Sequence, residues 1–333
     1  MIVFVINPIS GNGKSLQVWK RIEPLLAKRG VAYRAVRTAY AGHGTELARQ
    51  AVEELGDTLQ AVVAVGGDGT IHEVVNGVAE YPDVPVALIP SGSGNDFSRG
   101  FGGEREPEVV LERLLGHLLK REWAETASVS AANAKEGVES AVAVGEQVPA
   151  YDLGRYELLG SGKRGFFINA IGIGFDGEVA RVTNQAWYKP FLNRLRLGAL
   201  AYVVTVLRLL FTYQTHRVTL VVDGETQTYE RVWLLAVSNI PYYGGGMKIS
   251  PDAKPDDGEY HLCVVHGLSR LKLLLLFGTV FQGKHVRLPE VTVRTGRAVE
   301  VQSDRPMTIH GDGEILGTTP VGIELVAGGR RIL

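Results

Sequence analysis

The chain reads AVVAVGGDGT over residues 61–70, where an apolar run leads into three glycines around Asp68. The apolar run predicts a buried strand, and the spacing of the apolar residues beyond it predicts a helix over residues 71–80. Glycines at such a junction let backbone N–H groups approach an anion, because no Cβ stands in the way. The start of the helix favours a phosphate group as well. The stretch therefore predicts a strand, a phosphate-binding loop and a helix.

Asp68 is the informative residue of this loop. An acidic side chain beside phosphate groups has little use without a cation, and carboxylate oxygens are ligands that Mg²⁺ prefers. The loop thus predicts Mg²⁺ bound together with a nucleotide. The alternative is a tight turn that only begins the helix.

Strands and helices are predicted to alternate on both sides of this loop. Predicted strands cover residues 2–6, 31–36, 61–65 and 84–89, and predicted helices cover residues 18–28, 44–55, 71–80 and 108–120. This alternation predicts an α/β domain with a doubly wound, mostly parallel sheet. In such sheets, ligands bind beyond the carboxyl ends of the strands.

Two further loops follow predicted strands. PSGSGNDF (residues 90–97) repeats the logic of the first loop, because small residues allow a close approach while Asn95 and Asp96 supply polar contacts. Its alternative is a capping turn. NPISGNGKS (residues 7–15) is not a Walker A loop, because Pro8 stands where that motif needs a glycine. We interpret it as a loop of the first strand that reaches the nucleotide.

The second part of the chain has a different character. Residues 124–149 show little periodicity and are predicted to be an insertion or linker. Short β-branched runs bounded by turn residues follow, at residues 165–171, 217–222, 231–238, 260–265, 290–295, 298–303 and 322–326. They predict a mostly antiparallel, β-rich second domain, interrupted by helices at residues 177–185, 195–213 and 269–281. We expect domains at 1–125 and 126–333, with the last residues packing back on the first.

Three motifs of the second part have competing interpretations. GIGFDG (residues 172–177) fits the dinucleotide pattern, but no βαβ unit surrounds it, so we do not expect that function. PDAKPDDGE (residues 251–259) could hold a cation or form an Asp-Gly hairpin turn. HGDGE (residues 310–314) could supply a base for an acceptor hydroxyl, or could simply be a turn.

The composition limits the class of protein. The 333 residues, 45% of them hydrophobic, suffice for two cores, and a net charge of −1 gives no basic footprint for nucleic acid. A single cysteine, Cys263, excludes an intrachain disulfide.

Residues 1–6 lack the features of a signal peptide. Two eleven-residue apolar stretches, 197–207 and 273–283, fall short of the roughly 20 residues of a membrane span. They predict core helices or lipid-facing helices.

Together, these motifs resemble the diacylglycerol kinase catalytic-domain family, in its bacterial soluble lipid-kinase branch. The resemblance covers nearly the whole chain and rests on the order and spacing of the loops at residues 7–11, 66–73, 92–99, 152–154, 172–176, 251–258 and 312–314. GGDGT alone is shared with NAD kinases and phosphofructokinases. The resemblance implies an N-terminal domain of the kind found in NAD kinases and diacylglycerol kinases.

The resemblance also implies ATP, Mg²⁺ and a lipid alcohol, most often diacylglycerol, as the molecules that the protein binds. Residues expected at ATP are Asn7, Pro8, Ser10, Gly11, Thr38, Gly66, Gly67, Asp68, Gly69, Thr70, Glu73, Ser93 and Asn95. Asp68, Asp96 and Asp152 would organise the catalytic metal and its water network, and Glu314 would be the general base. Asp257, with the carbonyls of Lys254 and Glu259, would hold a structural Mg²⁺.

The expected reaction is transfer of the ATP γ-phosphoryl group to a lipid hydroxyl, giving phosphatidic acid when diacylglycerol is the acceptor. Without a predicted span, such an enzyme is expected in the cytoplasm, with peripheral contact at the inner membrane surface, and a homodimer is compatible with these features. One alternative is an NAD kinase, and another is a nucleotide-binding regulator without turnover. The acidic motifs at residues 251–258 and 312–314 favour the lipid kinase. Phosphatidylglycerol, a sphingoid base and undecaprenol remain open as acceptors.

Overall fold

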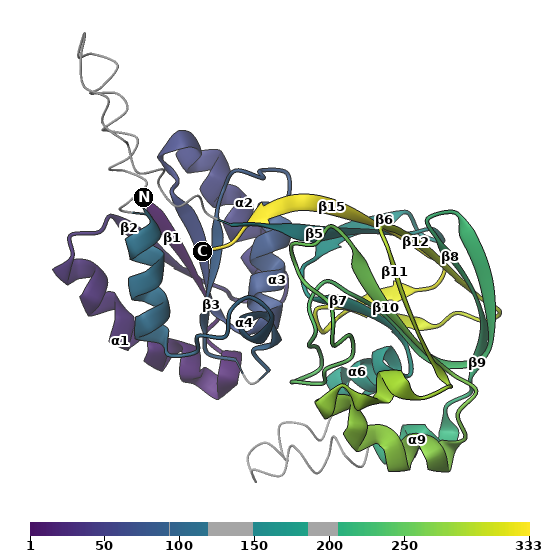
Figure 1. Ribbon diagram of the computed structural model, residues 1–333. Helices are drawn as coiled ribbons and strands as arrows, with labels where there is room; N and C mark the ends of the chain where they lie inside the picture. Colours follow the sequence, from purple (N-terminus) through teal and green to yellow (C-terminus); the bar gives the residue numbers. More distant parts are fainter. Residues whose placement is uncertain (93, 119–148, 186–205) are drawn as a thin grey trace, which may run out of the picture. The chain divides into compact units, whose positions relative to one another are not determined.

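The computed structural model describes residues 1–92, 94–118, 149–185 and 206–333 (Figure 1). The chain divides into two compact units. The N-terminal unit comprises Met1–Ser93, Gly103–Tyr151 and Gly328–Leu333, and the C-terminal unit comprises Gly94–Gly102 and Asp152–Ala327. The predicted insertion at residues 124–149 lies outside the described residues, apart from Pro149.

The N-terminal unit contains the predicted parallel sheet. Its strands are β1 (Ile2–Ile6), β2 (Tyr33–Arg37), β3 (Ala61–Gly66) and β4 (Val86–Pro90), in the order β2-β1-β3-β4. Every neighbouring pair is parallel. All residues of β1, β3 and β4 are buried, which explains why these strands are continuous apolar runs rather than alternating ones.

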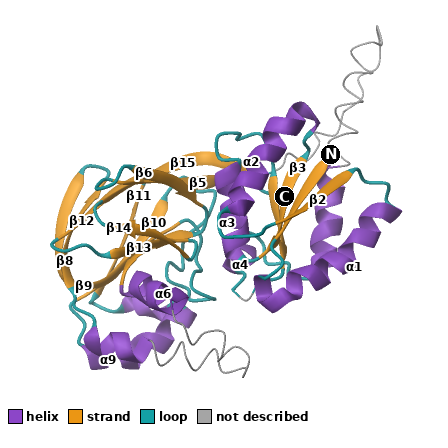
Figure 2. Cartoon of the chain, turned by 180° about the vertical axis from the view of Figure 1, so that it is seen from behind, coloured by secondary structure: helices purple, strands orange, loops and turns teal. Residues whose placement is uncertain are grey.

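Helices cover both faces of this sheet, as the doubly wound prediction requires (Figure 2). On one face, α1 (Lys14–Lys28) and a helix over residues 107–118 pack against the side chains of Phe4, Val63 and Ile89. The rings of Phe4 and Trp19 lie 5.1 Å apart there. On the other face, α2 (His43–Leu55) and α3 (Asp68–Gly77) contact β1, β3 and each other.

Arg330 ties the end of the chain to the N-terminal unit. Its side chain is fully buried, and its guanidinium donates hydrogen bonds to the carbonyls of Val78, Ala79, Tyr81 and Val84. These carbonyls follow the C-terminal end of α3, where a positive charge is favourable. Burial lowers the pKa of Arg330 to about 10, so the group stays charged at neutral pH.

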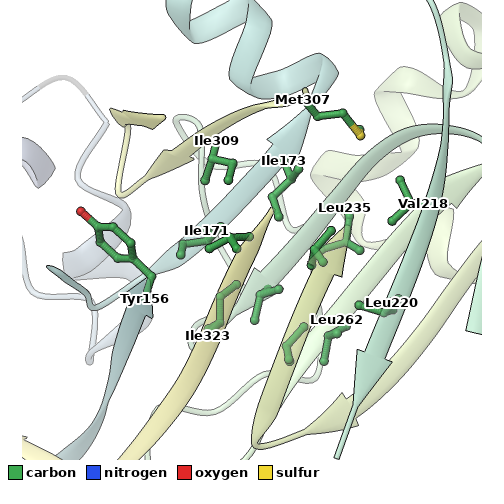
Figure 3. Close-up of a cluster of buried hydrophobic side chains, with 14 of the residues drawn as sticks. Tyr156, Ile171, Ile173, Val218, Leu220, Leu235, Leu262, Met307, Ile309 and Ile323 are labelled. Atoms are coloured by element: carbon green, nitrogen blue, oxygen red, sulfur yellow. The ribbon is translucent and has the colours of Figure 1, made fainter. Parts of the chain in front are cut away.

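In the described part of the C-terminal unit, eleven strands form one sheet. They are β5 (Ala150–Leu158), β6 (Lys163–Phe167), β7 (Ala170–Gly174), β8 (His216–Val222), β9 (Glu225–Ser238), β10 (Tyr260–His266), β11 (Val291–Gly296), β12 (Ala298–Ser303), β13 (Thr308–Gly311), β14 (Glu314–Thr318) and β15 (Val321–Arg331). Pairing is antiparallel from β9 to β7, β8 and β10, and from β13 to β7 and β14. The predicted antiparallel, β-rich fold is confirmed. Its strands enclose an apolar core that includes Ile173, Leu235 and Leu262 (Figure 3).

One predicted strand is two strands. Residues 165–171 were expected to be continuous, but β6 ends at Phe167 and β7 begins at Ala170. The break at Ile168 and Asn169 occurs because their backbone N–H groups donate to the carboxylate of Asp312, at 3.0 and 2.8 Å, instead of continuing a strand ladder. No local sequence pattern around residue 168 could indicate a hydrogen-bond partner 144 positions away.

Helices interrupt the sheet of the C-terminal unit. They are α4 (Asp96–Gly100), α6 (Phe175–Gln185), a helix over residues 206–212, and α9 (Arg270–Leu276) with the 3₁₀ helices η3 (Phe277–Gln282) and η4 (Lys284–Arg287). The predicted helix at 195–213 lies partly outside the described residues. Among the helices that the structure describes, none combines the length and apolar character needed to cross a bilayer.

The single thiol is expected to be inert in the folded protein. Cys263 lies in β10, fully buried beside Trp233 and Val265, and burial raises the pKa of its thiol to about 12. At neutral pH the thiol is therefore neutral as well as inaccessible, and the thiolate is the reactive species. We expect no labelling by a thiol-specific disulfide reagent until denaturant unfolds the protein. Native labelling at the rate of a free cysteine would contradict this burial.

Candidate active site

The carboxyl ends of the parallel strands hold the predicted nucleotide loops at one edge of the sheet. Asn7, Thr38 and Ser91 each follow a strand and donate their backbone N–H to the end of a neighbouring strand, at 3.1, 2.9 and 2.7 Å. The strand ladder thus continues one residue beyond β1, β2 and β4. The structure thereby brings together three loops that are far apart in the sequence, where a ligand of such a sheet binds.

Glycines in these loops allow a close backbone approach. Gly11 has a φ of +58°, and a Cβ there would lie 2.0 Å from the carbonyl oxygen of Ser91. A Cβ on Gly66 would lie 2.2 Å from Oγ1 of Thr70. Gly67 faces the backbone of Gly92, 3.0 Å from where its Cβ would be. Side chains at these positions would therefore push the loops apart.

The loop after β3 becomes the first turn of α3. Gly67 is the N-cap residue, and Asp68, Gly69 and Thr70 form the turn. The first amides of a helix lack partners within the helix, and among the described residues no side chain caps this end. Asp68 is half-buried, whereas Thr70 is buried and its Oγ1 accepts a hydrogen bond from Nδ2 of Asn7 at 3.3 Å. This helix start can accept an anion, and Asp68 supplies one carboxylate beside it.

The other residues predicted to contact ATP at this edge of the sheet are Pro8, Ser10 and Ser93. Pro8 and Ser10 belong to the loop after β1, and Ser10 begins a 3₁₀ turn over Ser10–Gly13. The Ser10 hydroxyl is 3.5 Å from the Cβ position of Gly67. Ser93 lies outside the described residues.

Glu73 has a structural role that the sequence did not indicate. Its carboxylate accepts hydrogen bonds from the backbone N–H groups of Gly42 and Gly44, at 2.7 and 2.8 Å. Its carbonyl accepts the hydroxyl of Thr45 at 3.0 Å. Glu73 therefore holds the start of α2 against α3, and its predicted contact with ATP stays a prediction.

In the C-terminal unit, Asp96 is a buried anchor. Its Oδ2 accepts the backbone N–H of Gly245 and its Oδ1 pairs with the guanidinium of Arg99, both at 2.6 Å. Asn95 precedes it as the N-cap of α4, with a left-handed φ of 53°. The Oδ1 atom of Asn95 is buried and has no hydrogen-bond partner among the described residues. Asp96 thus fixes the glycine loop around residue 245.

Asp152 is brought together with the acidic turn at residues 251–259. The backbone N–H of Asp152 donates to the carbonyl of Pro255 at 2.6 Å. Its buried carboxylate accepts the N–H of Gly258 at 2.8 Å. Two motifs that were interpreted separately therefore form one structural element.

The predicted structural Mg²⁺ site lies in the same turn. Oδ1 of Asp257 accepts the N–H of Glu259 at 3.1 Å, and its Oδ2 lies 3.5 Å from Nε2 of His261. Lys254 is exposed and Glu259 half-buried. Within the described ranges, no group of three or more His, Cys, Asp or Glu side chains gathers as a metal site. Metal binding at Asp257 stays a prediction, because one carboxylate with two carbonyls is not such a group.

The motif at residues 310–314 is a tight hairpin turn between β13 and β14. Asp312 and Gly313 occupy the turn with φ values of 52° and 92°, the pattern of a type I′ turn. The carboxylate of Asp312 is buried and accepts the N–H groups of Ile168, Asn169 and Ala170. Glu314 begins β14 and is exposed. The turn is rigidly anchored by Asp312 while Glu314 stays accessible.

Comparisons with known proteins agree with this arrangement. The model of the diacylglycerol kinase catalytic domain matches residues 1–124, and that of the YegS C-terminal NAD kinase beta sandwich-like domain matches residues 169–333. A Bacillus subtilis protein named "Putative lipid kinase YtlR" is 32% identical over 95% of this chain and 94% of its own length. The chain belongs to the diacylglycerol kinase catalytic-domain family.

Other relatives span the same length. A Mycobacterium tuberculosis protein named diacylglycerol kinase is 27% identical over 100% of this chain and 94% of its own. A Staphylococcus carnosus protein of the same name is 27% identical over 95% and 89%. A solved Bacillus anthracis structure described as a diacylglycerol kinase superposes with a TM-score of 0.65 at 20% identity, over 99% of this chain and 95% of that one. This last likeness shows that the fold is shared.

Asn239 is a buried residue beside the candidate site that sequence reasoning missed. Its Nδ2 donates to the carbonyls of Asp152 and Ile168, at 2.8 and 2.9 Å, and the whole group is buried. It therefore connects Asp152 to the backbone segment that Asp312 binds. The only local signal is a polar residue at the end of the apolar strand β9, which does not identify a partner 87 positions away.

Asp312 is expected to stabilise the fold more than an aspartate in the same kind of turn elsewhere. In Asp312→Asn an amide NH₂ would face backbone donors, so the buried amides lose an acceptor, at a cost of about 1–3 kcal/mol. Asp223 is the matched control, because it occupies an Asp-Gly turn with a φ of 50° and its carboxylate accepts the N–H groups of Arg297 and Ala298, yet it is exposed. Water can replace those bonds, so Asp223→Asn should change the free energy of unfolding by less than about 0.5 kcal/mol. Equal losses in denaturant unfolding would contradict the anchoring role.

Proposed function

We propose that the protein is an ATP-dependent lipid kinase that transfers the γ-phosphoryl group of ATP to a lipid hydroxyl, with diacylglycerol as the first candidate acceptor. The observation that carries the proposal is the glycine-lined edge of the N-terminal sheet, with the start of α3 and Asp68 beside it. Membership of the family supports the lipid acceptor, because relatives over the full length are named diacylglycerol kinase.

The loops at this edge would bind the phosphates of ATP mainly through the backbone. Gly11, Gly66 and Gly67 leave no room for side chains, so amide groups would approach the phosphate oxygens directly. The N-terminal turn of α3 would add the favourable end of a helix dipole. Asn7 and Thr70, which hydrogen-bond to each other, would keep two of the loops in register.

The donor set suits Mg²⁺ bound together with ATP. Magnesium sites in kinases typically use one or two carboxylates, with the other positions taken by phosphate oxygens and water. Asp68 would supply such a carboxylate at the start of α3, where the phosphates would bind. When bound, Mg²⁺ neutralises charge on the phosphates. A second, structural Mg²⁺ would be held by Asp257 with the carbonyls of Lys254 and Glu259.

Glu314 is the group that we assign as general base. It is exposed on the first residue of β14, so its carboxylate can reach a hydroxyl group, and its backbone is fixed by the anchored turn at Asp312. It would accept the proton of the lipid hydroxyl as the new O–P bond forms. Asp96 and Asp152 would act by positioning the loops at Gly245 and Gly258. No covalent enzyme intermediate is required.

The lipid acceptor places the reaction at a membrane surface. We propose that the protein works there from the cytoplasmic side, as a peripheral enzyme, and takes its acceptor from the inner leaflet. The hydroxyl of diacylglycerol lies at the level of the headgroups, so a peripheral protein can reach it.

A transfer assay with two acceptors tests this function. The protein is incubated with Mg²⁺ and γ-labelled ATP, together with mixed micelles containing diacylglycerol or with NAD. Label in an organic-extractable product supports the lipid kinase, and label in NADP instead would overturn it in favour of an NAD kinase. Saturable ATP binding without transfer to any lipid alcohol would overturn it in favour of a non-catalytic regulator.

A further inference from the structure

The C-terminal unit carries a concentration of exposed apolar side chains on α9 and the segments next to it. Leu271 and Leu275 of α9 are 66% and 72% exposed, Phe281 of η3 is 51% exposed, and Phe211 of the helix over residues 206–212 is 62% exposed. Arg270 of α9 donates a hydrogen bond to the carbonyl of Tyr213 at 3.0 Å, which joins α9 to the end of that helix. We call this set the α9 patch, and it comprises Leu207, Phe211, Leu271, Leu274, Leu275 and Phe281.

The exposed leucines are not needed for packing within the described part of the unit. Leu273 and Leu276, on the other side of α9, pack against the buried cluster that contains Trp233 and Val280. A short surface helix with one apolar stripe would already satisfy the core. Leu271 and Leu275 add a second apolar face, and contiguous apolar surface of this kind marks an interaction site.

The two stretches of chain that carry the α9 patch contain only positive charges. Residues 267–289 contain Arg270, Lys272, Lys284 and Arg287 and no aspartate or glutamate, and residues 206–218 add Arg208 and Arg217, again without an acid. Lys272 pairs with Glu290 and Arg217 pairs with Glu230, two acids that lie outside these stretches, whereas Lys284 and Arg287 are exposed. An apolar centre with a basic rim is complementary to a surface that is apolar inside and anionic at its boundary.

We propose that the α9 patch is the surface with which the protein docks on an anionic lipid bilayer. Leu271, Leu275 and Phe281 would enter the headgroup–acyl boundary, while the basic side chains contact lipid phosphates. The charge argues against a second copy of the chain on this face, because an isologous contact would bring two basic rims together. The purpose of the docking rests on the proposed lipid-kinase function, but the docking itself can be measured without it.

Vesicle binding tests the apolar part of the α9 patch. The full chain is floated with phosphatidylcholine vesicles that do or do not contain phosphatidylglycerol, and Leu271→Gln/Leu275→Gln is compared with Val109→Gln/Leu159→Gln. The control removes two apolar side chains that are 51% and 47% exposed elsewhere. We expect the α9 variant to bind anionic vesicles roughly 10- to 100-fold more weakly, and the control to bind like the unaltered protein. Equal binding by both variants would overturn the proposal.

A charge-reversal variant tests the basic side chains around the α9 patch. Lys284→Glu/Arg287→Glu should lose most of the preference for anionic over neutral vesicles, and added salt should have the same effect on the unaltered protein. Binding that is independent of both lipid charge and salt would contradict a basic rim. Light scattering gives the oligomeric state of each variant. A dimer that falls apart in the leucine variant, with unchanged vesicle binding, would assign the patch to self-association instead.

A dissolved acceptor separates docking from catalysis. With a short-chain diacylglycerol present as monomers in solution, the leucine variant should transfer phosphate as fast as the unaltered protein, and only its rate on vesicles should fall. Loss of both rates would overturn the docking role. If no variant phosphorylates any lipid but vesicle binding follows the pattern above, the proposed function fails and the docking surface stands.

Discussion

Replacing Asp68 by alanine is expected to lower kcat/KM for phosphoryl transfer by about 10²-fold or more, as removal of a charge that acts on the transferred group usually does. Asp68 lies in the first turn of α3, between Gly67 and the buried Thr70, where it is half-buried. In the proposed reaction its carboxylate would bind the Mg²⁺ that neutralises charge on the phosphates. Its loss leaves negative charge on the phosphates with less compensation, so the transition state should suffer most.

Two comparisons make the Asp68 experiment decisive. Asp68→Asn keeps the size of the side chain and removes only the charge, so it should lose nearly as much activity as Asp68→Ala. Asp57→Ala is the control, because Asp57 also stands in the first turn of a helix, the 3₁₀ helix η2 (Gly56–Thr58), and is exposed in the same unit. It should keep full activity. Near-normal turnover in Asp68→Asn, with unfolding unchanged in all three variants, would refute the assignment of Asp68.

The N-terminal sheet could be predicted closely because its signal is local. β1 is observed at the predicted residues, and β3 is one residue longer than predicted. Both could be predicted because a strand buried on both faces has an unbroken run of apolar residues. The start of α3 could not be predicted as well. The helix was expected from residue 71 but begins at Asp68, because the glycine loop itself forms the first turn. Glycine disfavours a helix, so Gly69 argues locally against this turn, although the turn forms and its Thr70 accepts a hydrogen bond from Asn7.

The candidate site could be predicted only in part, because only some of its contacts follow from local sequence. Parallel strands place their carboxyl ends together, so the convergence of the loops after β1, β3 and β4 follows from the sequence pattern. The partners of the carboxylates that anchor the loops do not follow from this pattern. Glu73 binds Gly42, Asp152 binds Gly258 and Asp312 binds Asn169, across separations of 31, 106 and 143 residues. Nothing in the neighbourhood of either partner specifies such a contact.

One tripeptide recurs in the chain, so its sequence alone cannot identify the general base. Asp-Gly-Glu occurs four times, at residues 176–178, 223–225, 257–259 and 312–314. The first lies in the opening turn of α6, the second forms the turn between β8 and β9, the third precedes β10, and the fourth forms the turn between β13 and β14. Only the fourth has its aspartate buried against three backbone amides. Position in the fold, and not the tripeptide, distinguishes Glu314.

Glu314→Gln is therefore expected to lower phosphoryl transfer by about 10²-fold while ATP binding stays within about twofold, since general bases typically contribute 10²–10⁴-fold. Glutamine keeps the shape of the side chain but cannot accept the proton of the lipid hydroxyl. Single-turnover transfer to diacylglycerol and equilibrium binding of ATP separate the two effects. A fall in both would indicate a disturbed fold instead of a lost base.

Glu225→Gln is the matched control for this experiment. Glu225 begins β9 directly after an Asp-Gly turn of the same φ pattern, just as Glu314 begins β14, and it is exposed and pairs with Arg294 at 2.7 Å. Its loss removes one surface ion pair, which is worth about 0–1 kcal/mol, and should leave transfer unchanged. Full activity in both variants would mean that Glu314 accepts no proton in the reaction. Because the two glutamates share tripeptide, turn and strand position, a loss of transfer in the Glu314 variant alone would assign the effect to the place of that turn in the fold.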